Sequence, residues 1–186
     1  KWNFINFRPG LVGGHCIGVD PYYLINKSEQ FGYEPKILQN ARLVNENIVD
    51  FIAENITKKF SEKNINLSDA NVEVLGITFK ENVNDIRNSK AIDLVKKLKE
   101  KNINVYVQDP NANIDLVKKE YGITVEREFN SKKVDLLVVA VGHDQYKQIQ
   151  YDNIYNMLNE NKIVFDIKNV FDNKKMKQMG FDYWRL

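Results

Sequence analysis

The longest regular pattern of apolar residues in this chain lies between residues 35 and 61. Its apolar positions are four and three residues apart, a spacing that draws one stripe along a helix. They are Ile37, Ala41, Val44, Ile48, Ile52, Ile56 and Phe60. A helix from Pro35 to Ser61 would be roughly 40 Å long, too long for one small domain to cover. We therefore predict a connecting helix whose apolar stripe also forms a dimer surface.

Shorter segments flank this helix. The stretch from Pro21 to Phe31 favours a short helix that ends at Gly32. Residues 1 to 7 alternate loosely and are predicted to be extended. Polar residues from Asn64 to Asp69 indicate a linker. Residues 1–67 therefore form a mainly helical region, which is followed by a second region at 68–186.

The second region alternates between strand and helix patterns. The predicted strands are Val72–Thr78, Val105–Val107, Thr124–Val125, Val134–Val141 and Ile163–Ile167, and the predicted helices are Ser89–Lys101, Ile114–Tyr121 and Ile154–Leu158. The run from Val134 to Val141 is continuously apolar, which is typical of a strand buried on both faces of a parallel sheet. The pattern predicts an α/β fold with a doubly wound, mostly parallel, Rossmann-like sheet.

Composition excludes several classes of function. The 186 residues are 43% hydrophobic and 28% charged with a net charge of +2, and no basic stripe is interleaved with aromatic residues. We therefore expect no nucleic-acid partner. No run of about 18 apolar residues is present, so we expect no membrane span. A single cysteine forms no internal disulfide and fits a reducing, cytoplasmic setting. No metal site is predicted.

The candidate chemistry centres on that cysteine. Cys16 follows the pair Gly13-Gly14 and precedes Asp20 by four residues. Glycines allow the backbone to approach a ligand closely, and an activated thiol can attack an electrophilic carbon. The alternative is a buried structural cysteine in a glycine turn.

A second group of candidate residues follows the first predicted strand. No Gly-x-Gly-x-x-Gly is present there, so Asp109 after the second strand is not a ribose ligand. Lys80 and Arg87 instead precede a helix start, which suits a diphosphate. Arg87 could also pair with Asp85 or Glu81 on the surface. His143 is interpreted as a loop histidine without a role in the mechanism.

Two separated motifs resemble the UDP-glucose/GDP-mannose dehydrogenase family. The first is Gly13-Gly14-His15-Cys16 with Asp20, and the second runs from Gly76-Ile77-Thr78-Phe79-Lys80 to Asp85-Ile86-Arg87-Asn88-Ser89. The sequence from Val19 to Leu24 is most similar to that of members that oxidise UDP-N-acetylhexosamines. The resemblance implies that the chain is a C-terminal portion: residues 1–67 belong to the central catalytic and dimerisation domain, residues 68–186 bind the UDP-sugar, and the N-terminal NAD-binding domain is absent.

The resemblance also implies roles for individual residues. Cys16 is the catalytic nucleophile, Asp20 assists hydrolysis, and Arg87 contacts the cofactor NAD. The residues implied to bind the UDP-sugar are Phe7, Gly10, Gly13, Gly14, Phe79, Lys80 and Lys168. Lys168 makes a point contact where an arginine would be bidentate. The long helix is implied to lie at a homodimer interface.

The implied reaction oxidises the C6 hydroxyl of a UDP-sugar to a carboxylate with two NAD⁺, through a thioester on Cys16. Two other functions remain open from the sequence. The chain can be a UDP-binding and dimerisation module that is inactive without the NAD domain. It can also be a cysteine hydrolase that pairs Cys16 with a histidine, although His15 is poorly placed as its neighbour.

Overall fold

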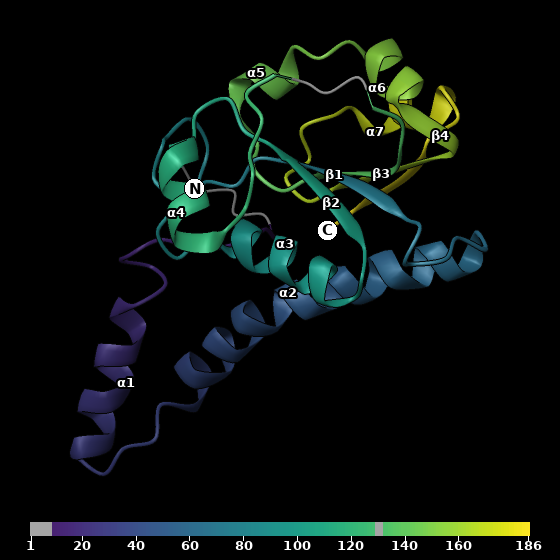
Figure 1. Cartoon of the computed structure of the whole chain (residues 1–186). Coiled ribbons are helices and arrows are strands. Elements are labelled where there is room, and N and C mark those ends of the chain that lie inside the picture. The colour runs from purple at the N-terminus through teal and green to yellow at the C-terminus, as the bar shows by residue number, and fades with distance from the viewer. Residues whose placement is uncertain (1–8, 129–131) are drawn as a thin grey trace, which may run out of the picture.

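The computed structural model describes residues 9–128 and 132–186. Its first two helices, α1 (Asp20–Gln30) and α2 (Lys36–Glu62), form a hairpin at one end of an α/β body (Figure 1). Gly32 has a φ of +75° in the turn between them, which favours a residue without Cβ. The 27 residues of α2 confirm the predicted long helix. The predicted extended lead at residues 1–7 lies outside the described residues.

A five-stranded sheet forms the centre of the α/β body. Its strands are β1 (Asn71–Leu75), β2 (Asn104–Gln108), β3 (Val134–Val139), β4 (Leu158–Asp166) and β5 (Asp182–Arg185). They lie in the order β2-β1-β3-β4-β5, and every neighbouring pair is parallel. The parallel α/β sheet that the sequence predicts is therefore confirmed.

Helices cover both faces of the sheet (Figure 1). One face packs against α2, α3 (Lys90–Glu100) and α4 (Ile114–Tyr121), and the other against α5 (Asp144–Lys147), α6 (Tyr151–Met157) and α7 (Asn173–Gln178). The alternation within β1 shows the two sides: Val72 and Val74 belong to the first core, and Leu75 to the second. The fold is doubly wound, because helices pack on both faces of the parallel sheet.

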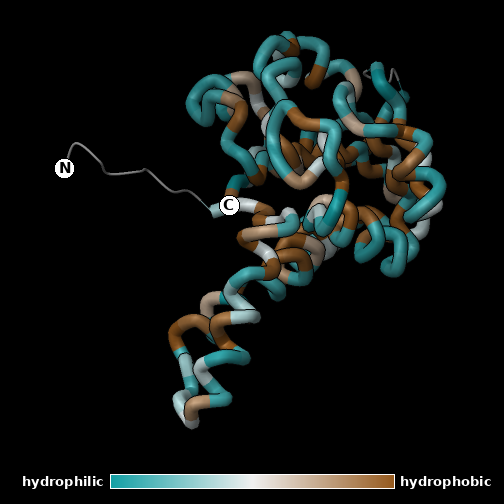
Figure 2. Tube along the Cα trace, turned by 90° about the vertical axis from the view of Figure 1, so that its left-hand side faces the viewer, coloured by the Kyte–Doolittle hydropathy of each residue, from teal (hydrophilic) through white to brown (hydrophobic). Residues whose placement is uncertain are grey.

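The long helix α2 has two unequal halves. Ile52, Ile56 and Phe60 are fully buried against the α/β body, whereas Ile37 is 89% exposed and Val44 is 70% exposed. Figure 2 shows the α1–α2 hairpin extending away from the body with hydrophobic segments along it. The prediction that the whole stripe is a free dimer surface is therefore wrong for its C-terminal half. Only the N-terminal half remains open to a partner.

Other differences lie in short elements. The expected strand at Thr124–Val125 is absent, and only a single bridge joins Gln108 to Glu126. The sequence pattern also missed α5, α7 and the edge strand β5, in which Trp184 stacks on Phe165 with ring centroids 4.6 Å apart. Among the helices in the described ranges, none is long and apolar enough to cross a membrane.

Candidate functional site

The sheet has a switch point between β1 and β3. The chain leaves β1 for β2 at the edge and then returns to β3 on the other side of β1. Folds of this kind bind ligands outside the carboxyl ends of the strands at such a point. The two strand ends lie very close here, because a Cβ on Gly76 would be 2.4 Å from Cβ of Val141. The loops that follow β1 and β3 are therefore the first place to look for a site.

Asp109, directly after β2, anchors the base of these loops. Its buried carboxylate accepts backbone N–H groups of Ile77 (2.7 Å) and Thr78 (3.3 Å) through Oδ2, and of Asn111 and Ala112 (both 2.8 Å) through Oδ1. Burial raises the pKa of this carboxyl, but hydrogen bonds from a histidine and from the backbone lower it below its usual range. The carboxylate therefore bonds to the protein's own backbone and to a histidine.

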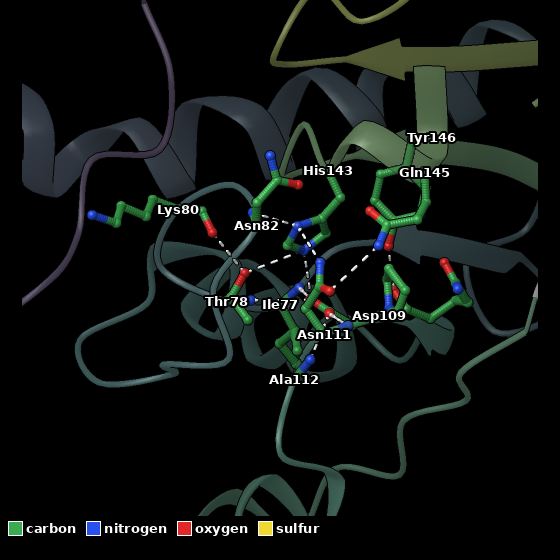
Figure 3. Close-up of polar contacts among 12 residues, drawn as sticks. Ile77, Thr78, Lys80, Asn82, Asp109, Asn111, Ala112, His143, Gln145 and Tyr146 are labelled. Carbon is green, nitrogen blue, oxygen red and sulfur yellow. Dashed lines mark hydrogen bonds and ion pairs between the residues drawn. The ribbon is translucent and has the colours of Figure 1, made fainter. Parts of the chain in front are cut away.

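His143, which follows β3, completes this buried cluster (Figure 3). Its Nε2 lies 3.1 Å from Asp109 Oδ2 and 3.2 Å from Thr78 Oγ1, and the ring is fully buried. Its Nδ1 lies 2.9 Å from the backbone nitrogen of Asn82. The sequence predicted a satisfied loop histidine, and the structure confirms that much. The sequence could not show that the ring connects the loops that follow β1, β2 and β3.

The loop after β1 presents two of the predicted ligand residues, Phe79 and Lys80. Figure 3 shows the Lys80 side chain extending away from the buried cluster while its carbonyl accepts the Thr78 hydroxyl at 2.9 Å. The Lys80 ammonium is exposed, lies 5.3 Å from the Phe79 ring centroid, and forms no ion pair within residues 9–128 and 132–186. It is therefore available to an anionic ligand.

Lys168 lines a narrow pocket of about 10 Å³. This pocket is also lined by Lys80 and Glu81. The Lys168 ammonium forms an ion pair with Glu81 at 2.6 Å. Burial raises the pKa of Glu81, but the hydrogen bond and charge of Lys168, together with a backbone hydrogen bond, lower it below its usual range. A Cβ on Gly10 would lie 3.6 Å from Lys168 Nζ, so the structure brings four predicted ligand residues together: Gly10, Phe79, Lys80 and Lys168.

The glycine pair docks the cysteine segment on the α/β body. A Cβ on Gly13 would be 2.2 Å from the Asn88 carbonyl oxygen, and one on Gly14 would be 2.8 Å from the Phe79 ring. The Gly14 N–H donates to the Asn88 carbonyl at 3.2 Å. Gly14 also has a φ of +95°. The two glycines are therefore required for close approach to the protein's own loop beside the pocket.

Cys16 lies just beyond this contact, in the turn that begins α1. Its carbonyl accepts N–H groups of Val19 (2.9 Å) and Asp20 (2.8 Å), and its side chain is exposed. The alternative of a buried structural cysteine is therefore wrong. Asp20 is exposed at the first position of α1. Cys16 and Asp20 therefore both lie on the surface, just after the glycine contacts. Phe7, another predicted ligand residue, lies outside the described residues.

Arg87 is close to the same loop, but it is held by a carboxylate. Its Nη2 lies 2.6 Å from Asp85 Oδ2, which bears out the surface pairing that the sequence left open. The guanidinium lowers the pKa of Asp85 to about 2. His15 Nδ1 also faces Asp85, at 3.9 Å. Asp85 therefore links the cysteine segment to the predicted cofactor-binding arginine.

A larger cavity of about 330 Å³ adjoins the glycine segment between α2 and α3. Arg42, which is 7% exposed, and Lys90 both pair with Glu46 there, at 2.9 and 2.5 Å. The sequence analysis did not single out these residues. Arg42 lies outside the apolar stripe of α2, and charged residues at such positions of a helix are usually exposed.

Family models match both parts of the chain. The UDP-binding domain of the UDP-glucose/GDP-mannose dehydrogenase family matches residues 73–173, and the central domain of the same family matches residues 2–47. This chain belongs to the UDP-glucose/GDP-mannose dehydrogenase family. The region matched by its UDP-binding domain includes the loops after β1, β2, β3 and β4, and so contains the whole of the narrow pocket except its contacts from residues 10–14.

Individual relatives agree with this membership. The chain is 45% identical over 170 residues to UDP-N-acetyl-D-glucosamine 6-dehydrogenase of Salmonella typhi, covering 91% of this chain and 40% of the relative. It is 41% identical to Protein CapL of Staphylococcus aureus, covering 100% of this chain and 43% of the relative. The solved UDP-D-ManNAc dehydrogenase of Pyrococcus horikoshii superposes with a TM-score of 0.80 at 25% identity, over 98% of this chain and 40% of that one. The chain thus spans less than half the length of these relatives.

Proposed function

We propose that this chain is the C-terminal portion of a nucleotide-sugar 6-dehydrogenase that oxidises a UDP-N-acetylhexosamine to the corresponding uronic acid, a precursor for polysaccharide synthesis. One observation carries the proposal: the segment bearing Cys16 is docked by Gly13 and Gly14 beside the pocket that holds Lys80 and Lys168. Similarity to a UDP-N-acetyl-D-glucosamine 6-dehydrogenase supports the sugar class. Residues 1–67 belong, in this proposal, to the central domain, and residues 68–186 bind the UDP moiety.

Different residues of the pocket contact the diphosphate and the sugar. Lys80, which has no carboxylate partner among the described residues, attracts the diphosphate, and Lys168 makes a second contact when it leaves Glu81. The Phe79 ring and the backbone at Gly10, Gly13 and Gly14 form the wall of the site that faces the sugar. Phe7 would extend this wall. Binding at this point directs the C6 end of the sugar toward the exposed thiol.

Cys16 supplies the covalent step. Its thiolate adds to the C6 aldehyde, forming a C–S bond while the carbonyl oxygen takes a proton. The resulting thiohemiacetal can lose a hydride from carbon and the proton from its hydroxyl group to become a thioester. Water then attacks the thioester carbonyl, the C–S bond breaks, and the uronate and the thiol are released. Asp20, whose backbone N–H donates to the Cys16 carbonyl at 2.8 Å, takes the proton from that water.

Within the part of the chain that the structure describes, Arg87 is the residue that we assign to a contact with NAD. Arg87 is exposed, and Asp85 engages its Nε and Nη2 but not its Nη1. The first βα turn, in contrast, has no glycine loop for a dinucleotide. Arg87 would therefore contact one end of the cofactor, whose main site belongs to another domain. When bound, NAD accepts the hydride in both oxidations.

Two further expectations accompany the proposal. The exposed apolar residues on α1 and the first half of α2 form a homodimer interface. The isolated chain then acts as a UDP-binding and dimerisation module without turnover. The cysteine-hydrolase alternative is disfavoured, because both ring nitrogens of His143 are engaged in a buried cluster and are closed to Cys16.

The test counts reducing equivalents in the enzyme that contains this chain. With a panel of UDP-N-acetylhexosamines, two NADH should form for each uronate, and Cys16→Ser should abolish uronate formation. His15→Ser serves as the matched control, because it changes the neighbouring residue and leaves the thiol. Uronate formation at the normal rate by Cys16→Ser would contradict the proposal, as would NADH formation by the isolated 186-residue chain.

A further inference from the structure

The hydrogen bonds around His143 determine its tautomer. Nδ1 lies 2.9 Å from the backbone nitrogen of Asn82 and 2.9 Å from the side-chain Nδ2 of Asn111. Both of these groups are donors, so Nδ1 must be an acceptor. The proton therefore resides on Nε2, which donates to Asp109 Oδ2 at 3.1 Å. The ring is held in the neutral Nε2–H form.

This arrangement pins the loop after β1 at both ends. Asp109 accepts the N–H groups of Ile77 and Thr78 where the loop begins, and His143 accepts the N–H of Asn82 where it turns back. Between them, the Thr78 hydroxyl donates to the Lys80 carbonyl at 2.9 Å. Asn82 has a φ of +60°, in the left-handed region that asparagine adopts readily, and the chain reverses there. The segment that carries Phe79 and Lys80 is thus fixed by groups beneath it.

We propose that His143 is a positioning residue for the nucleotide pocket. It touches no ligand; through Asn82 and Asp109 it holds the Thr78–Asn82 loop so that Lys80 is directed into the pocket before the nucleotide arrives. Preorganisation of this kind contributes to affinity because a loop already ordered loses less entropy on binding. The inference rests on the proposed UDP-binding role of the pocket.

Three variants separate positioning from simple stability. His143→Ala removes both hydrogen-bonding atoms and leaves Asp109 without its histidine donor. His143→Gln retains one donor and one acceptor on a single side chain and should restore much of the function. Tyr146→Phe is the matched control: it removes a buried hydroxyl bonded to the Gln108 carbonyl at 2.9 Å, and its ring is 5.4 Å from the His143 ring. It leaves the loop contacts intact.

Amide hydrogen exchange tests positioning without a ligand. In His143→Ala, amides of residues 79–82 should exchange about tenfold faster or more, whereas protection in β3 and β4 changes little. Tyr146→Phe should leave the 79–82 amides as they are in the unaltered chain. Unchanged protection of 79–82 in His143→Ala would overturn the proposal. If that variant does not fold, His143→Phe, which keeps an aromatic ring, replaces it in the same comparison with His143→Gln.

Calorimetric titration with UDP tests the consequence for binding. UDP should bind His143→Ala about tenfold more weakly than the unaltered chain, while His143→Gln and Tyr146→Phe stay within about threefold. Equal affinity in His143→Ala would overturn the positioning role in binding. Absence of UDP binding by the unaltered chain would instead contradict the proposed function, and the exchange measurement would still decide whether His143 orders the loop.

Discussion

Lys168 and Glu81, which both line the candidate pocket, form an ion pair at 2.6 Å. Glu81 belongs to the loop after β1 and Lys168 to the loop after β4, so the pair spans the intervening strand β3. The Glu81 carboxylate thus neutralises the Lys168 ammonium, which we propose binds the nucleotide. The pair therefore competes with an anionic ligand for Lys168.

Replacement of Glu81 should make this competition measurable. Glu81→Gln should raise the affinity for UDP by about fivefold, because it frees Lys168 and removes a negative charge near the diphosphate. Asp50→Asn is the control, since Asp50 pairs with Lys97 at the same 2.6 Å but outside the pocket. Titration calorimetry of both variants gives the comparison. Weaker binding by Glu81→Gln would show that Glu81 supports Lys168 instead of competing for it.

The glycine contacts predict a position-specific effect on stability. Gly13→Ala should lower the free energy of unfolding by about 1–3 kcal/mol, because the new Cβ would meet the rigid Asn88 carbonyl at 2.2 Å. Gly10→Ala should change it by less than about 0.5 kcal/mol, since its Cβ would meet only the flexible Lys168 side chain at 3.6 Å. Denaturant unfolding measures both. Equal effects would mean that the segment before Cys16 is not docked as described.

Buried Glu73 predicts a pH dependence of stability. Burial, followed by repulsion from Glu126, raises the pKa of Glu73 from 4.5 to about 7, against the attraction of Lys132. Between these values the unfolded chain loses the proton and the folded chain keeps it. The free energy of unfolding therefore has its full value from Glu73 below pH 4.5. It falls by up to about 3 kcal/mol as the pH rises through 7 and the buried carboxyl loses its proton.

The variant Glu73→Gln should remove this dependence. Its free energy of unfolding, measured with denaturant from pH 4.5 to 8, should exceed that of the unaltered chain at pH 8 and match it more closely at pH 4.5. The difference between the two proteins isolates Glu73 from other titrating groups. A difference that is constant with pH would contradict the assignment.

The proposed dimer predicts which half of α2 is sensitive to charge. Val44→Glu, at a 70% exposed position, should shift a dimer toward monomer in sedimentation velocity and leave the melting temperature nearly unchanged. Ile52→Glu should instead unfold the α/β body, because Ile52 is fully buried within it. A monomeric unaltered chain at tens of micromolar would contradict the dimer.

The sequence predicted the elements with long patterns. The regular stripe of α2 and the apolar run of β3 were found because burial imposes a repeating pattern over many residues. It missed β5, because an edge strand of four half-exposed residues carries no apolar alternation. It also assigned all of the α2 stripe to a partner, because the pattern shows that a face is apolar and does not show what covers it.

The candidate site was predictable only where it is local in the chain. The glycine-cysteine segment and the Phe79-Lys80 loop are contiguous motifs, so their residues could be named in advance. The cluster of Asp109 and His143 depends on loops after different strands meeting at the switch point. Pairings of that kind follow from strand order, which no short motif contains.

The most direct test of the account is to map UDP binding on the ¹⁵N-labelled chain by NMR. We predict that the largest amide shifts fall on Phe79, Lys80 and the residues around Lys168, with smaller shifts at Gly13 and Gly14. Arg42 and Glu46, on the α2 side of the larger cavity, should be unaffected. Shifts that cluster around Arg42 instead, or no shifts at millimolar UDP, would contradict the claim that the pocket at the carboxyl ends of β1 and β4 binds the nucleotide.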